Sequence, residues 1–112
     1  MTGRLDRVNE VVKEEVSRAL LHELDLEEGV LVTVTKVDTS RTLEHTRVWV
    51  SVYPDNKTEE ILEQLNRQIY DVQQIVNKRL KMRPVPKIIF KLDMSGQVVG
   101  EVEEIAKKLY NK

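Results

Sequence analysis

The sequence predicts an α+β fold in which helices cover one face of a three-stranded sheet. Three stretches repeat apolar residues at helical spacing, and three shorter ones alternate apolar and polar residues, as half-buried strands do. The chain has 112 residues, the size of one domain, and this length buries roughly two-thirds of the unfolded surface. It has no cysteine, which excludes disulfides, thiol nucleophiles and thiolate metal sites.

The first helix is expected from Arg4 to Leu24. Its apolar residues share one stripe: Leu5, Val8, Val12, Val16, Ala19 and Leu20. On the opposite side, Glu14 precedes Arg18 by four residues, which is the favourable order for a helical ion pair. Gly29 marks the turn that follows.

Two strands come next, at 30–38 and 47–53. In the first, Val32 and Val34 alternate with threonines, and Val37 breaks this phase, which predicts a bulge or a strand end near Lys36. In the second, the core-facing residues are Val48, Val50 and Val52. A polar connection joins the two strands and is longer than a tight hairpin turn.

The longest helical stripe runs through residues 58–82. Its members are Ile61, Leu65, Ile69, Val72, Val76 and Leu80. Asn56 or Thr58 is the expected N-cap, and prolines at 84 and 86 end the helix. Residues 87–93 alternate again and predict the third strand, with Ile88, Phe90 and Leu92 on one face.

A short last helix is expected over 101–110, with Val102, Ile105, Ala106 and Leu109 apolar. Gly100 weakens its start, so residues 95–112 are expected to be less ordered than the rest. No apolar run approaches the roughly 18 residues that a membrane span needs. The N-terminus shows no apolar signal region, so the expected location is the cytoplasm, away from membranes.

Six basic residues and no acid lie between Asp71 and Asp93: Lys78, Arg79, Lys81, Arg83, Lys87 and Lys91. The net charge is −1, so the chain without these six bases carries −7. One interpretation is a solvated face that also favours the helix dipole. The other is a phosphate-binding strip running from the helix end onto the last strand, extended by Arg4 and Arg7.

Helical spacing would place Lys78 near Lys81, and Arg79 near Arg83. We expect Arg79 and Lys81 to be dispensable for the fold, since exposed changes usually cost little stability. Trp49 lies on the strand face opposite the core valines. It is either covered by Lys stems or the last helix, or it is an exposed platform for RNA or a protein partner.

Catalysis is not predicted. His22 and His45 stand alone, and we expect ordinary surface roles for both. The sequence shows no Ser/His/Asp set, no cluster of metal ligands and no phosphate-binding glycine motif. We therefore expect no enzymatic activity, no metal and no cofactor.

Three stretches, in order and at family spacing, resemble the ribosome-binding factor A family. The first is RLDRVNE at 4–10 with EEV at 14–16. The second is VTVTKV at 32–37, followed by Ser40, Leu43 and VWVS at 48–51. The third is KRLKMRPVPKIIF at 78–90, with Asp93 and Ser95. The resemblance covers nearly the whole chain.

The resemblance implies a single type II KH-like domain of order α-β-β-α-(kink)-α-β, plus the short C-terminal helix. It implies a monomeric assembly factor that binds the free 30S small ribosomal subunit and its 16S rRNA, with assembly GTPases as candidate further partners. The resemblance also implies roles in late maturation of the subunit, in 5′-end processing of 16S rRNA and in cold adaptation. The alternative function is a KH-like protein–protein adaptor that does not bind RNA directly.

The family's Ala-x-Gly kink reads Gln68, Ile69 and Tyr70 here, and the basic residue expected three positions later is Gln73. No Gly or Pro occurs from 57 to 82, so local preferences allow one helix where the resemblance implies two. We predict a break near 68–70. Without a glycine loop between these helices the chain should not grip single-stranded RNA as other KH domains do. Duplex or structured RNA, contacted through its phosphates, fits this sequence better than single-stranded RNA does.

Overall fold

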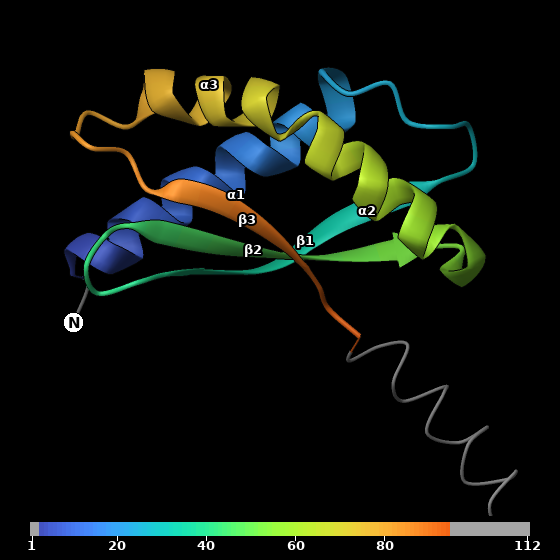
Figure 1. Ribbon diagram of the computed structural model, residues 1–112, viewed down its shortest axis with the longest axis horizontal. Coiled ribbons are helices and arrows are strands. Elements are labelled where there is room, and N and C mark those ends of the chain that lie inside the picture. The colour runs from blue at the N-terminus through green and yellow to red at the C-terminus, as the bar shows by residue number, and fades with distance from the viewer. Residues whose placement is uncertain (1–2, 95–112) are drawn as a thin grey trace, which may run out of the picture.

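The computed structural model describes residues 3–94 and confirms the predicted α+β, KH-like order (Figure 1). The elements are α1 (Arg4–His22), β1 (Leu31–Thr39), β2 (His45–Tyr53), the 3-10 turn η1 (Asp55–Lys57), α2 (Thr58–Arg67), α3 (Ile69–Arg79) and β3 (Lys87–Leu92). The three α-helices lie on one face of the sheet, and no other element among residues 3–94 covers its opposite face, here called the open face (Figure 1). The helix expected at 101–110 and the expected lower order of 95–112 lie outside the described residues.

The sheet has the strand order β1-β2-β3. β1 and β2 are antiparallel, whereas β2 and β3 are parallel, so the chain needs a long crossover between them, and α2 and α3 provide it. The register of β1 on β2 shifts between Val34 and Lys36, which confirms the predicted bulge. The shift places Lys36 opposite Trp49 on the open face and Val37 opposite Val48 on the helix side.

The core lies between the helices and the sheet. Its most deeply buried apolar side chains come from every layer: Val12, Val16, Val48, Val50, Ile61, Leu65, Val72 and Val76. A buried polar pair sits among them, because the hydroxyls of Thr39 and Thr46 lie 3.0 Å apart and Thr39 donates to Asn9 Oδ1 at 2.6 Å. Within residues 3–94, no buried side-chain nitrogen or oxygen lacks a hydrogen-bond partner.

The long helical stretch is broken at Gln68, as predicted. Gln68 has φ −99° and ψ 9°, outside the helical region, and separates α2 from α3. Ile61 and Leu65 of α2 and Val72 and Val76 of α3 are all buried. The break therefore lets two helices with different axes press their apolar sides onto one short sheet (Figure 1).

The expected N-cap is wrong. Neither Asn56 nor Thr58 caps α2, because η1 precedes the helix and Lys57 takes the cap position without a side-chain hydrogen bond. The hydroxyl of Thr58 instead donates to the carbonyl oxygen of Asp55 at 2.7 Å. The 3-10 turn thus leads the chain into α2 without side-chain capping.

Candidate nucleic-acid interface

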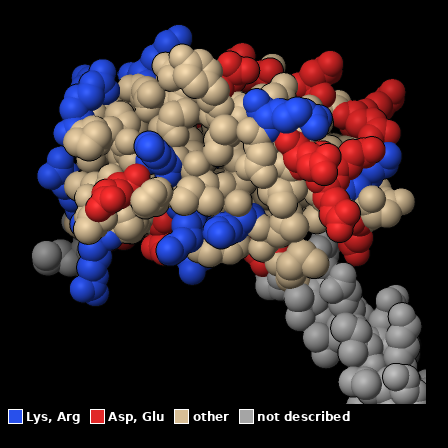
Figure 2. All heavy atoms as spheres, in the orientation of Figure 1, with Lys and Arg blue, Asp and Glu red and all other residues tan. Residues whose placement is uncertain are grey.

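Seven of the eight predicted basic residues gather at the end of the molecule where α1 begins and α3 ends. All eight are exposed: Arg4, Arg7, Lys78, Arg79, Lys81, Arg83, Lys87 and Lys91. In Figure 2, Lys and Arg predominate at this end, whereas Asp and Glu gather at the opposite end. Seven of the bases divide between two pockets, on either side of the connection from α3 to β3, and Lys91 lies apart on the open face of the sheet.

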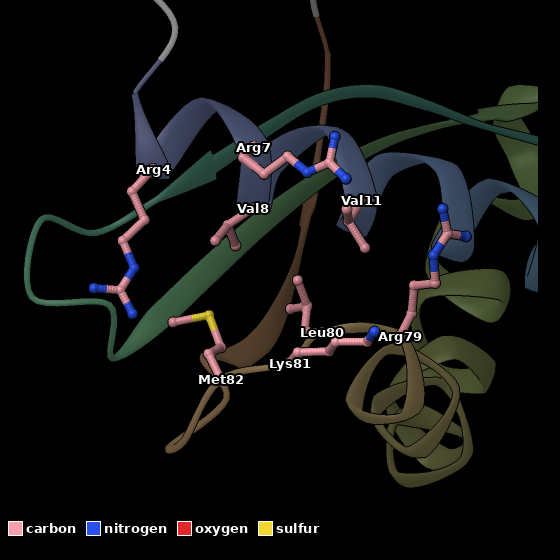
Figure 3. A pocket seen from close by; sticks show the side chains of 8 residues that line it. All are labelled: Arg4, Arg7, Val8, Val11, Arg79, Leu80, Lys81 and Met82. Atoms are coloured by element: carbon pink, nitrogen blue, oxygen red, sulfur yellow. The ribbon is translucent and has the colours of Figure 1, made fainter.

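The first group, here called the α1 cluster, consists of Arg4, Arg7, Arg79 and Lys81. These residues line a pocket of about 400 Å³ between α1 and the segment that follows α3. Figure 3 shows Arg4 and Arg79 at opposite ends of this pocket. The remaining lining is apolar: Val8, Val11, Leu80 and Met82.

The second group, the β3 cluster, consists of Lys78, Arg83 and Lys87. They line an open pocket of about 570 Å³ with amide side chains of α3 and with Pro84 and Val85. Lys81 shares a pocket with Arg79, and Lys78 shares one with Arg83, which differs from the grouping that helical spacing suggests. α3 ends at Arg79, so Lys81 and Arg83 do not follow the helical repeat.

Arg79 differs from its neighbours because it is paired. Its guanidinium hydrogen-bonds to the carboxylate of Glu15 and lies 3.9 Å from that of Glu14. The Glu15 side chain is only 8% exposed and also faces Arg18 at 3.7 Å. Arg79 therefore joins α3 to α1. That its loss leaves the fold intact stays a prediction. The predicted Glu14–Arg18 pair is present, at 3.8 Å.

Sequence reasoning missed Glu15, although a signal was available. Glu15 follows Val11 by four residues and Val12 by three, so it lies on the buried side of α1. An acid on a buried stripe needs a cationic partner from another element. That requirement pointed to one of the bases elsewhere in the chain.

Trp49 lies in a row across the open sheet face, flanked by Lys36 on β1 and Lys91 on β3. The Lys36 Nζ atom is 5.1 Å from the centre of the indole ring, within cation–π distance. Trp49 is half-buried, whereas Val48 and Val50 are fully buried, which confirms the predicted difference in burial. A lysine side chain thus partly covers Trp49. This is one of the two kinds of cover that the sequence predicts, the other being the last helix.

Gln73 occupies the position where the family resemblance suggested a base. Its side chain donates to the carbonyl of Pro86 at 3.1 Å and accepts from the backbone N–H of Ile88 at 2.8 Å. These two bonds tie α3 to the start of β3, an edge strand of the sheet. The Gln73 side chain is therefore committed within the protein.

The opposite end of the molecule is acidic. Segments 23–28 and 55–63 carry eight acids and one base, Lys57. The Lys57 amine lies 3.2 Å from Glu27 and 3.4 Å from Glu60, and the hydrogen bonds to these carboxylates, that of Glu27 first, raise its pKa above the usual value. Gln64, which directly follows the second segment, donates to the carbonyl of Asp25 in the first.

Other kinds of site find no support in the part of the chain that the structure describes. No group of three or more His, Asp or Glu residues between 3 and 94 is arranged to hold a metal ion. Among the same residues, no helix combines the length and the apolar character that crossing a membrane requires.

Comparisons with known proteins agree with the resemblance. A family model described as ribosome-binding factor A matches residues 4–106. The protein of that name from Akkermansia muciniphila is 32% identical over 113 residues, covering 97% of this chain and 90% of the relative. Its counterpart from Caldanaerobacter subterraneus is also 32% identical, with 97% and 91% covered.

Solved structures show the same fold at lower identity. The crystal structure of ribosome-binding factor A from Thermus thermophilus has a TM-score of 0.69 and 21% identity, covering 81% of this chain and 97% of that one. A Thermus thermophilus model fitted into a cryo-EM map of a complex with the 30S subunit has a TM-score of 0.62 and 20% identity, covering 75% and 89%.

Proposed function

Because this chain belongs to the ribosome-binding factor A family, we propose that it binds the free small ribosomal subunit through its 16S rRNA. It assists late maturation of the subunit, including processing of the 5′ end of 16S rRNA, and it matters most in the cold. It acts in the cytoplasm as a monomer without enzymatic activity, and assembly GTPases are its candidate further partners.

The observation that carries this proposal is the set of exposed cations that remain without acidic partners. Within residues 3–94, none of Arg4, Arg7, Lys78, Lys81, Arg83 and Lys87 forms an ion pair. Unpaired cations gathered at one end supply the sequence-independent part of RNA affinity, because phosphates that they neutralise release counterions. Arg79 contributes less, since its charge already faces Glu15 and Glu14.

Co-sedimentation tests the proposal. The chain should travel with free small subunits and not with assembled ribosomes. The double variant Lys81→Ala/Arg83→Ala takes one unpaired base from each cluster and should bind the subunit more weakly. The matched control is Lys13→Ala/Arg67→Ala, which removes two exposed bases, one on α1 and one at the end of α2, outside both clusters.

The adaptor function makes the opposite prediction. An adaptor would bind a ribosomal protein with little response to salt and would not bind 16S rRNA stripped of protein. Equal binding by the cluster variant and its control, together with no affinity for the bare rRNA, would overturn the proposed function in favour of the adaptor.

A further inference from the structure

We propose that the pocket of the α1 cluster holds one unstacked nucleotide from a bulge or loop of structured RNA. The inference rests on the proposed function and adds the chemical class of the ligand. The pocket volume of about 400 Å³ lies within the range of roughly 300–1,000 Å³ that small-molecule sites occupy. A groove that met only the phosphates of a duplex would need no such hollow.

The lining of the pocket matches the two parts of a nucleotide. Figure 3 shows Val8, Leu80 and Met82 facing the space between α1 and the segment after α3. These apolar groups suit the face of a base, and the Met82 thioether suits an aromatic ring in particular. Unstacked bases are the part of structured RNA that protein side chains can contact by their faces and edges.

The four basic residues of the α1 cluster have different roles. Arg7 and Lys81 form no ion pair within residues 3–94, so both can bind a phosphate. Arg7 stands between the two ends of the pocket, and the Lys81 amine lies beside Arg79 (Figure 3). Arg79 is held by Glu15 and Glu14, so it fixes the far wall and adds little net charge. Arg4 can reach the next phosphate along the strand, because it stands at the opposite end.

The β3 cluster has a different lining. Its pocket is larger, about 570 Å³, and amide side chains of α3 line it together with Pro84 and Val85. It also offers three cations, Lys78, Arg83 and Lys87, but one of its amides, Gln73, is already bonded to the backbone of β3. We therefore assign general phosphate contacts to the β3 cluster and the nucleotide to the α1 cluster.

Three RNA hairpins test the assignment: one with a single-nucleotide bulge, one with an abasic residue in the bulge and one fully paired. The chain should bind the bulged hairpin roughly tenfold more tightly than the other two, the scale of one base contact. Met82→Ala should remove this preference, and Met82→Leu should restore most of it.

Charge variants provide the matched control. Arg7→Ala and Lys81→Ala should weaken binding and reduce the preference for the bulge. Lys78→Ala and Arg83→Ala, which remove the same charges from the β3 cluster, should weaken binding to all three hairpins alike. Thermal unfolding of each variant shows whether it is folded in the assay.

Equal affinity for all three hairpins would overturn the assignment. A free nucleoside 5′-monophosphate that shifts the Met82 methyl NMR signal and binds as tightly as the bulge would overturn the RNA source. If Met82→Ala loses the preference but still co-sediments normally with small subunits, the pocket reads a nucleotide that subunit binding does not require. If the preference is absent while co-sedimentation holds, the pocket assignment fails and the proposed function stands.

Discussion

Arg79 shows how one base differs from its neighbour of the same charge. Arg79→Ala should lower the free energy of unfolding by about 1–2 kcal/mol, because it leaves the buried Glu15 carboxylate with only Arg18 nearby. Lys78→Ala, which has no ion partner within residues 3–94, should stay within about 0.5 kcal/mol. Urea unfolding measures the change in the free energy of unfolding for both variants, provided that the m-value stays constant.

A double-mutant cycle separates this pair from the loss of side-chain packing. Glu15→Gln should recover part of the loss in the Arg79→Ala background, because it removes the buried charge that was left unpaired. If the two changes add without coupling, the contact in the structure contributes nothing measurable to stability.

Trp49 is the second residue whose role depends on its surroundings. Trp49→Ala should cost about 1 kcal/mol or less, since the ring is half-buried and its contact with Lys36 is an exposed cation–π pair. Val48→Ala on the same strand should cost about 2 kcal/mol, because it removes buried methyl groups from the core.

The same Trp49 variant tests the open face as an RNA platform. If the row from Lys36 to Lys91 meets RNA, Trp49→Ala should weaken co-sedimentation with small subunits, and Trp49→Phe should retain more of it. Unchanged binding with a large fall in melting temperature would show that the ring serves the fold alone.

At the scale of elements, the break at Gln68 separates local preference from packing. Gln68 lies outside the helical region, so Gln68→Gly should cost less stability than glycine inside a helix, apart from losing the hydrogen bond that Gln68 Oε1 accepts from Gln64. Glu63→Gly, at an exposed site inside α2, should cost about 1 kcal/mol, the usual penalty for glycine in a helix. Equal costs would indicate a helix that runs continuously through residue 68 in solution.

The elements could be predicted because their signals are periodic and local. Alternation and helical stripes placed all three strands and α1 to within two residues, and the phase change at Val37 placed the bulge. The break at Gln68 had no local signal, because the stripe from Ile61 to Leu80 also fits one helix. It came from the family resemblance and depends on packing against a short sheet, which no local pattern encodes.

The residues of the candidate site could be predicted from the sequence, but their grouping could not, because the grouping depends on tertiary packing. The list of bases followed from composition, and their exposure is as expected. Their division into two clusters depends on where α3 ends and on the turn of residues 80–86, so it required the tertiary structure. The pairing of Arg79 with Glu15 joins residues 64 positions apart, which places it beyond local spacing rules.

At the scale of the whole molecule, the charge separation predicts how the chain is oriented on RNA under the proposed function. The basic end carries both clusters, and segments 23–28 and 55–63 make the other end acidic (Figure 2). Opposed ends of this kind steer a protein toward a polyanion with the basic end first. The acidic end is therefore expected to stay away from phosphates and to displace no counterions.

Salt dependence of binding to 16S rRNA tests this orientation. Each of Arg7→Ala and Arg83→Ala should reduce the slope of log affinity against log salt by about 0.7–0.9, because one phosphate contact is lost. Glu59→Gln and Glu63→Gln at the acidic end should raise affinity slightly at low salt by reducing repulsion, with the slope unchanged. If the acidic-end variants change the slope as much as the basic ones, both ends meet RNA and the proposed orientation is wrong.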